Sequence, residues 1–352
     1  MQGMQVWGAM EAGGFEEILY ASDPASGLKA VIVLHNTQAG PALGGCRMWN
    51  YVSEEEALTD AMKLARGMTY KSAISGLPCG GGKAVIWGDP AKDKSEALFR
   101  SFGRVLERMK GRYITGVDLG TTVQDMDFIA METSHVTDMT GTLGGSGNYT
   151  AEMTAYGVYL GIEASLQEAA GSRSLAGKRV AVQGLGKVGY ALCRYLRKAG
   201  AELLVSDVNP PLTERAVREF GASAVSPGAI YAQDCDVFAP CALGGILNDA
   251  VLAQLSCRVV AGAANNQLAG PETAGELQAR GILYAPDYAI NAGGIIATAL
   301  ELQGRGAEEI RRRVETIGQT LADVYRLARS SGADTAQAAD RLAEARLAEL
   351  AP

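Results

Sequence analysis

The stretch VAVQGLGKVGYAL, residues 180 to 192, says most about the fold. Gly184, Gly186 and Gly189 have the G-x-G-x-x-G spacing of a dinucleotide-binding turn between a buried strand and a helix. Such glycines permit a tight turn and let a pyrophosphate approach the helix N-terminus. The next apolar run ends on Asp207, roughly 20 residues after the first glycine, where a carboxylate binds ribose hydroxyls and repels a 2'-phosphate. The pattern predicts NAD as cofactor, unless the glycines only pack a helix against a sheet.

The sequence around this stretch alternates between helix-like and strand-like segments. From about residue 155, a predicted helix is followed by the apolar runs KRVAVQG, ELLVSDV, CDVFAP, CRVVAGAAN and GILYAP. This alternation is typical of a doubly wound parallel sheet. Each run ends in polar or glycine-rich sequence, where an open sheet of this kind binds its ligands.

The N-terminal half mixes strands and helices differently. Strand-like runs lie at 28–35 and 83–88, and a helix is predicted at 94–109. Ser53 and Glu56 form the pattern of a capping box at the start of another helix, which is expected to end just before Lys71.

A chain of 352 residues is long for one hydrophobic core, so two domains are expected. The predicted class is α/β, with an N-terminal α/β substrate domain, a C-terminal Rossmann-type doubly wound parallel sheet and a cleft between them. Residues 1–147 would bind substrate, carry catalysis and oligomerise, and residues 148–330 would bind NAD. Residues 331–352 would form a helix packing back on the first domain. The apolar stripe from Ile310 to Leu327 is interpreted as core or a subunit contact.

Charge and cysteine content exclude several classes of partner. The net charge of -7 argues against a nucleic-acid or anionic-membrane surface and favours small-molecule partners. The six cysteines form no C-x-x-C pair, and only two histidines are present, so no metal site is expected. The sequence has no signal-peptide pattern and no long apolar run, which predicts a reduced, soluble, cytoplasmic protein.

The stretch GLPCGGGKAVIWGDP, residues 76 to 90, places Lys83 after three glycines. A phosphate loop would need glycine at 77 and Ser or Thr at 84, but the chain has Leu77 and Ala84. Lys71, Lys83 and Asp118 all lie in apolar or glycine-rich surroundings. Each alone could be a solvated surface charge, whereas two lysines and one aspartate meeting in a cleft would suit acid–base chemistry and carboxylate binding.

Eight blocks of sequence, in order along nearly the whole chain, resemble the NAD-dependent leucine, valine and phenylalanine dehydrogenases, which are relatives of glutamate dehydrogenase. The blocks are GPALGGCRMW (40–49), ARGMTYK (65–71), CGGGKAVIWGDP (79–90), GVDLGTTVQDMD (116–127), QGLGKVGY (183–190), APCALGG (239–245), GAANNQL (262–268) and APDYAINAGG (285–294).

The resemblance assigns roles to individual positions. It implies that Lys71 holds the substrate carboxylate, that Lys83 is the catalytic acid–base group and that Asp118 is its partner in proton transfer. Asn265 would lie near the amino group and the nicotinamide. The three glycines would then clear space for the Lys83 amine to meet the substrate. The implied substrate-binding set is Lys71, Leu43, Gly44, Gly116, Asn265, Asn291, Ile295 and Thr298, and the implied cofactor-binding set is Gly184, Gly186, Lys187, Val188, Gly189, Asp207, Ala242 and Asn265, with no metal.

The implied reaction is the reversible, NAD-dependent oxidative deamination of a bulky apolar L-amino acid to its 2-oxo acid and ammonia. Gly116 resembles the phenylalanine enzymes, whereas leucine enzymes carry alanine there, and the missing methyl group would enlarge the pocket floor. QGLGKVGY leans the same way, while TYKSAISGLPCGGGK and DMD lean toward leucine and valine. Phenylalanine is slightly favoured, with leucine, valine or tryptophan as alternatives. Thr298 stands where an apolar residue is usual, and its hydroxyl group keeps amino acids with polar side chains among the possible substrates.

Two other functions compete with this interpretation. A catalytically weak NAD-binding protein that senses metabolites would not need Lys71, Lys83 and Asp118 together. A 2-hydroxy acid dehydrogenase commonly uses a histidine base, and neither His35 nor His135 lies in a suitable motif. The resemblance also implies a homo-oligomer. The chain departs from the family pattern at Val117, at Ala299-Leu300-Glu301-Leu302 and in an apparent one-residue insertion near 149–152.

Overall fold

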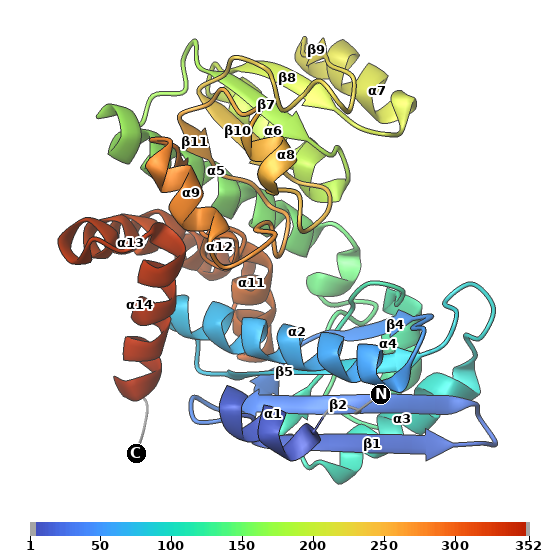
Figure 1. Ribbon diagram of the computed structural model, residues 1–352. Helices are drawn as coiled ribbons and strands as arrows, with labels where there is room; N and C mark the ends of the chain where they lie inside the picture. Colours follow the sequence, from blue (N-terminus) through green and yellow to red (C-terminus); the bar gives the residue numbers. More distant parts are fainter. Residues whose placement is uncertain (1–4, 350–352) are drawn as a thin grey trace. The chain divides into compact units, whose positions relative to one another are not determined.

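A computed structural model describes residues 5–349, which fold into two compact units (Figure 1). Unit 1 comprises the residues up to Gly147, the segment Thr298–Gly304 and the described residues from Ala343 onward. Unit 2 comprises Asn148–Ala297 and Arg305–Leu342. The chain therefore passes from one unit to the other inside two of its helices, α11 (Gly293–Leu302) and α14 (Thr335–Glu349).

The sheet of unit 1 has mixed strand directions. Its order is β1-β2-β5-β3-β6, and β4 also pairs with β5. Neighbours β1, β2 and β5 are antiparallel, whereas β3 and β4 run parallel to β5. The predicted strand at 83–88 begins earlier than expected, so the three glycines lie inside it. The bounds are β1 Glu17–Asp23, β2 Leu28–Asn36, β3 Ala42–Leu43, β4 Cys46–Trp49, β5 Gly80–Trp87 and β6 Tyr113–Ile114.

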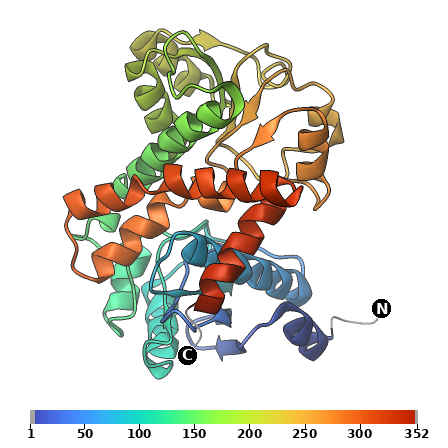
Figure 2. The ribbon, with the colours of Figure 1, turned by 90° about the vertical axis from the view of Figure 1, so that its left-hand side faces the viewer.

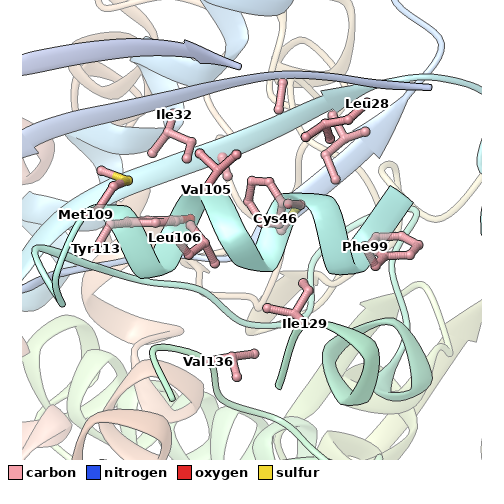
Figure 3. Packing of buried hydrophobic residues seen from close by; sticks show 14 of the residues in the cluster. Leu28, Ile32, Cys46, Phe99, Val105, Leu106, Met109, Tyr113, Ile129 and Val136 are labelled. Carbon is pink, nitrogen blue, oxygen red and sulfur yellow. The ribbon is translucent and has the colours of Figure 1, made fainter. Parts of the chain in front are cut away.

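Helices cover both faces of this sheet, so its central strands are buried on both sides. Along β2, Ile32 and Leu34 belong to the core on the side of α3 (Glu96–Arg108) and α4 (Val123–Ala130), seen in Figure 3. Val31 and Val33, which point the opposite way, belong to the core under α2 (Glu54–Ile74). A run with no polar position in its middle is what such a strand requires. Unit 1 also contains α1 (Val6–Gly13) and the short 3-10 turn η1 (Gly144–Ser146).

Helix α2 begins and ends with identifiable contacts. The Ser53 hydroxyl accepts the N–H of Glu56 at 3.1 Å, which confirms the predicted cap. The helix continues to Ile74, so Lys71 lies in its last turn and the prediction that it follows the helix is wrong. The helical pattern continues because Thr69, Ser72 and Ala73 are all buried. Residues from α14 also contact α2: Arg346 donates to the Ile74 carbonyl, and Tyr70 donates to Glu344 at 2.8 Å.

Unit 2 is built on a sheet of parallel strands in the order β12-β11-β10-β7-β8-β9. The strand order reverses between β7 and β10, which creates the switch point where doubly wound sheets bind ligands. The predicted α/β class, with a mixed N-terminal part and a C-terminal doubly wound parallel sheet, is confirmed. The strands are β7 Arg179–Gln183, β8 Glu202–Ser206, β9 Ser223–Ala224, β10 Val237–Pro240, β11 Val259–Val260 and β12 Leu283–Tyr284. The helices of this unit are α5 Tyr149–Ala170, α6 Lys187–Lys198, α7 Pro210–Phe220, α8 Asp249–Leu252, α9 Thr273–Ala279, α10 Asp287–Ile290, α12 Ala307–Val314 and α13 Ile317–Ser331.

The apolar C-terminal stripe is divided between two helices, α12 and α13. Ile310, Val314, Ile317 and Val324 are all buried, as expected of core positions. Helix α13 ends at Gly332, whose φ of 69° lies in the left-handed region, and the chain then bends sharply into α14 (Figure 2). Within residues 5–349, no helix is both long and apolar enough to cross a membrane.

Candidate active site

Lys83 and Asp118 form an ion pair in unit 1, in which the lysine is buried and the aspartate is partly exposed. Lys83 is only 3% exposed, and its Nζ donates to Asp118 Oδ2. Strand β5 carries the lysine, whereas the aspartate lies in the loop between β6 and α4. Thr121 fixes that loop, because its hydroxyl accepts the Asp118 N–H at 2.9 Å and lies 2.9 Å from the Cys46 carbonyl, to which it can donate. A lysine buried to this degree needs a charged partner, and this loop supplies it.

Arg47 extends the pair into a network of charges. Its Nε donates to Asp118 Oδ1 at 3.0 Å, and its Nη1 donates to Asp60 Oδ2 at 2.9 Å. The Tyr51 hydroxyl donates to the same Asp60 oxygen at 2.5 Å. Burial alone would raise the pKa of Asp118, but Lys83 and Arg47 outweigh it and lower the pKa to about 2. Asp118 is therefore an anion at neutral pH and a fixed hydrogen-bond acceptor.

The glycines before Lys83 bring protein segments together. A Cβ atom on Gly80 would lie 1.9 Å from the Asn36 carbonyl oxygen, and one on Gly81 would lie 2.0 Å from the Thr69 nitrogen. On Gly82 it would lie 3.0 Å from the Tyr113 ring. The space expected to admit the substrate is thus filled by β2, α2 and a tyrosine, so that part of the sequence interpretation is wrong.

A second pair of glycines brings β5 and the Asp118 loop close to the segment between β3 and β4. A Cβ atom on Gly44 would lie 1.9 Å from the Gly82 carbonyl oxygen, and one on Gly45 would lie 2.8 Å from Asp118 Cβ. The Tyr113 hydroxyl donates to the Gly44 carbonyl at 2.7 Å. These contacts place the backbone of residues 44–45 directly against the segments that carry the ion pair.

The other unit 1 residues of the predicted substrate set lie on four different elements. Leu43 ends β3 and is buried, and Lys71 lies in the last turn of α2 and is half-buried. Gly116 follows β6, and Thr298 lies in the part of α11 that belongs to unit 1. Of these, Gly116 is linked to the ion pair. It lies two residues before Asp118, and its carbonyl accepts the Cys46 N–H at 2.8 Å.

The space beside Gly116 is already occupied. A Cβ atom there would lie 2.5 Å from Asp138 Oδ2 and 2.5 Å from the Thr137 hydroxyl oxygen. The missing methyl group therefore does not leave the enlarged pocket floor expected from the sequence. This removes one of the two sequence features that favoured phenylalanine.

In unit 2, the glycine turn lies at the switch point of the sheet. Gly184 has φ +94° and follows β7, and a Cβ atom on it would lie 2.8 Å from that of Ala242, which follows β10. On Gly189 it would lie 1.9 Å from the Gly184 carbonyl, so α6 packs tightly on the turn. A Cβ atom on Gly186 would meet nothing within 4 Å, which leaves open space on that side.

The start of α6 has the properties of a phosphate site. Gly186 is its N-cap, no side chain caps it, and its first turn, which includes Lys187, Val188 and Gly189, contains no acidic residue. Uncapped N–H groups at a helix N-terminus favour an anion. Asp207 braces the turn, since Oδ2 accepts the Leu185 N–H at 2.6 Å. The residues present therefore fit a bound dinucleotide.

Two asparagines of the predicted set meet in unit 2. Asn291 is 4% exposed and donates to Asn265 Oδ1 at 2.8 Å and to the Ala263 carbonyl at 3.1 Å. The Asn291 Oδ1 atom is buried without a hydrogen-bond partner. Asn265 itself is exposed, and Ile295 is buried in the first turns of α11. Asn291 thus holds the carbonyl end of the Asn265 amide in one orientation.

Sequence reasoning missed several polar residues of unit 1. Arg47 stands inside the block GPALGGCRMW. An arginine shortly after two glycines was a signal in the sequence that could have identified it as a site residue. Asp60, Tyr51 and Asp138 had no distinguishing pattern, because tertiary contacts alone bring them to the ion pair or to Gly116. Among residues 5–349, no group of three or more histidine, cysteine, aspartate or glutamate side chains could hold a metal ion.

A chain that combines a glycine turn at the switch point of a parallel sheet with an ion pair between a buried lysine and an aspartate has the features of a nicotinamide-dependent oxidoreductase. Residues 16–135 match the family described as Glu/Leu/Phe/Val dehydrogenase, dimerisation domain. Residues 144–216 and 212–351 match the family described as Glutamate/Leucine/Phenylalanine/Valine dehydrogenase. The chain belongs to this family, whose members are NAD(P)-dependent amino-acid dehydrogenases, oxidoreductases acting on CH–NH2 groups. The predicted family and enzyme class are confirmed.

Similar proteins act on several amino acids. Leucine dehydrogenase of Geobacillus stearothermophilus is 53% identical over 98% of this chain and 94% of its own length. Valine dehydrogenase of Streptomyces coelicolor is 45% identical over 97% and 94%. The crystal structure of L-tryptophan dehydrogenase from Nostoc punctiforme has a TM-score of 0.86 at 41% identity, covering 98% of this chain and 99% of its own. A hetero-hexameric glutamate dehydrogenase from Thermus thermophilus has a TM-score of 0.78 at 27% identity, covering 96% and 89%.

Proposed function

We propose that this protein catalyses the reversible, NAD-dependent oxidative deamination of an apolar L-amino acid to its 2-oxo acid and ammonia. The observation that carries the proposal is the ion pair of the buried Lys83 with Asp118, which Arg47 also contacts, in a chain that belongs to a family of amino-acid dehydrogenases. A surface lysine would need no such support. Charges buried and braced in this way are typical of residues that move protons.

The proposed roles in unit 1 follow from the chemistry of the groups. Lys71 binds the substrate carboxylate. Lys83 exchanges protons with the attacking water and with the amino group that leaves: after hydride loss gives an iminium, the lysine amine removes a proton from the water as its oxygen adds to the carbon. The resulting ammonium returns that proton to the amino group, the C–N bond breaks to release ammonia, and the hydroxyl proton passes to the Lys83 amine as the C=O bond of the 2-oxo acid forms. Asp118 stays ionised throughout, because its pKa of about 2 is far below neutral, and it keeps the Lys83 amine in place.

In unit 2, the proposed cofactor residues are those around the glycine turn, with Gly186 and the first turn of α6 facing the pyrophosphate. The nicotinamide, when bound, accepts hydride from the substrate Cα. Asp207 would accept hydrogen bonds from the adenosine ribose hydroxyls and repel a 2'-phosphate, which supports NAD over NADP. Asn265, held by Asn291, would contact the nicotinamide and the substrate amino group.

For the substrate side chain we propose a branched aliphatic group, as in leucine or valine, ahead of phenylalanine and tryptophan. The carboxylate of Asp138 and the hydroxyl of Thr137 fill the volume that Gly116 leaves, which argues against an enlarged pocket floor. The leucine dehydrogenase that is 53% identical to this chain supports the same choice.

The division of labour between residues 1–147, 148–330 and 331–352 stays a prediction. We also propose a homo-oligomer. The description of the matched N-terminal family as a dimerisation domain supports it, and the hetero-hexameric assembly of the Thermus thermophilus enzyme supports an oligomer in general. Light scattering coupled to size-exclusion chromatography would measure the mass, and a monomer at micromolar concentration would contradict the proposal.

The central experiment follows the absorbance of reduced cofactor with a panel of L-amino acids and either NAD or NADP. We expect leucine and valine with NAD to be turned over fastest. Lys83→Ala should lower the rate at least about a hundredfold, because it removes the proton-transfer group.

Lys92→Ala is the matched control, because Lys92 is a lysine of the same unit whose side chain is 79% exposed and pairs with its neighbour Asp89. Its rate should equal that of the wild type. Full activity in Lys83→Ala would remove Lys83 from the mechanism. NAD binding without turnover of any amino acid would favour a metabolite-sensing protein instead.

A further inference from the structure

Asp138 carries three costs that a buried structural residue usually avoids. Its φ of 61° lies in the left-handed region, where a residue with a Cβ atom is strained. Its Oδ1 atom is buried without a hydrogen-bond partner. Burial also raises the pKa of its carboxyl group, with the nearby Glu301 adding to the rise and the Val117 N–H opposing it. A glycine would avoid all three costs.

The two carboxylate oxygens of Asp138 lie against two glycines, Gly116 and Gly144. Oδ2 lies 2.5 Å from the position of a Cβ atom on Gly116, and Oδ1 lies 2.2 Å from that of a Cβ atom on Gly144. The turn that contains Gly144 is also held by Glu301, which accepts the N–H groups of Leu143 and, at 3.0 Å, of Gly144. The carboxylate therefore has little freedom to move away from Gly116.

Asp138 also reaches the segment that ends in the catalytic aspartate. Its Oδ2 accepts the N–H of Val117 at 3.0 Å, and Val117 directly precedes Asp118. The Thr137 hydroxyl lies 3.3 Å from the same oxygen. One carboxylate oxygen thus both fills the space at Gly116 and fixes the backbone between Gly116 and Asp118.

We infer that Asp138 is a specificity-determining residue of this enzyme: its carboxylate takes the volume that a methyl group on residue 116 would take, and so sets the size and polarity of the side-chain pocket at that point. The inference rests on the proposed function, in which Gly116 lines the site of the substrate side chain. Glycine at 116 and aspartate at 138 act as a pair, with the pocket size of an enzyme that has alanine at 116. The substrate class that follows is the branched aliphatic amino acids, with aromatic side chains excluded by the carboxylate.

The test compares kcat/KM for leucine and phenylalanine in the wild type and three variants. Asp138→Gly should raise the phenylalanine-to-leucine ratio at least about tenfold, because one or two carbon atoms of pocket volume are worth that much. Asp138→Asn keeps the volume and can still accept the Val117 N–H, so its ratio should stay within about twofold of wild type. If Asp138→Gly does not fold, Asp138→Ala takes its place, and the same rise in the phenylalanine-to-leucine ratio is expected.

The pairing with Gly116 has a readout that does not depend on activity. Gly116→Ala should lower the melting temperature, because its methyl group meets the carboxylate, and Gly116→Ala with Asp138→Gly should recover most of the loss. The Thr137 hydroxyl can rotate away from the methyl group in the double variant. An unchanged ratio in Asp138→Gly, or an undisturbed Gly116→Ala, overturns the inference. Lys83→Ala tests the proposed function separately, and a wild-type enzyme that turns over no apolar amino acid overturns both.

Discussion

Gly80, Gly81 and Gly44 in unit 1 serve the opposite purpose to Gly186 in unit 2, although these glycines look alike in the sequence. In unit 1, a Cβ atom on Gly80, Gly81 or Gly44 would come within 2.0 Å of backbone atoms, so these glycines let protein segments touch. In unit 2, a Cβ atom on Gly186 would meet nothing, so this glycine leaves space beside an uncapped helix N-terminus. The first arrangement holds charged side chains in place, and the second leaves space for a ligand beside a helix N-terminus.

The same contrast appears in how each unit satisfies its polar groups. The carboxylate of Asp118 has Lys83, Arg47 and the Leu119 N–H as partners. The first turn of α6 has Gly186 as its N-cap, with no side-chain cap hydrogen bond and no acidic residue. A site that performs proton transfer gains from partners that fix its geometry in advance. A site that binds an anion gains from a helix N-terminus that no acidic side chain occupies.

The largest expected effect is on the folding of unit 1. Gly81→Ala would place a methyl group 2.0 Å from the Thr69 nitrogen and should lower the free energy of unfolding by about 3 kcal/mol or more. Urea denaturation followed by circular dichroism measures it. Gly67→Ala is the control, since Gly67 lies on α2 with open space around its Cβ position, and alanine favours a helix. Equal stability of the two variants would show that β5 and α2 can move apart at no cost.

The sequence was sufficient where local pattern and chemistry coincide. The glycine turn, the cap at Ser53 and the candidate pair Lys83 and Asp118 are each visible in a short window. The purpose of Gly80–Gly82 was not visible, because a glycine run looks the same whether a ligand or a neighbouring backbone fills the space. Arg47 and Asp138 act through residues 71 and 22 positions away, and only the folded chain brings such positions together.

The next effect concerns cofactor affinity. Gly186 has φ -64°, which alanine adopts without strain, so Gly186→Ala should fold with an unchanged melting temperature. Its methyl group would enter the space beside the first turn of α6 and should weaken NAD binding about tenfold, or about 1.4 kcal/mol. Isothermal titration calorimetry gives the dissociation constant.

Gly228→Ala is the matched control in unit 2, because a Cβ atom there also meets nothing within 4 Å. It should change neither stability nor affinity. Wild-type affinity in Gly186→Ala would remove the open space beside Gly186 from the proposed cofactor site and would weaken the contrast between the two units.

The smallest effect tests whether the charge network of unit 1 also stabilises the fold. The pKa of Asp118 is lowered from 3.8 to about 2, so its contribution to stability is present above pH 3.8 and is lost as the pH falls through about 2. By pH 3 the loss should be about 1 kcal/mol, from linkage with these two pKa values.

Asp118→Asn cannot lose this contribution, because its side chain does not titrate. The difference in unfolding free energy between wild type and Asp118→Asn, from urea denaturation at pH 6 and pH 3, should therefore shift by that amount in favour of the variant at the lower pH. A difference that does not change with pH would mean that Lys83 and Arg47 hold the carboxylate only weakly, so that the charged partners in unit 1 do not stabilise its fold.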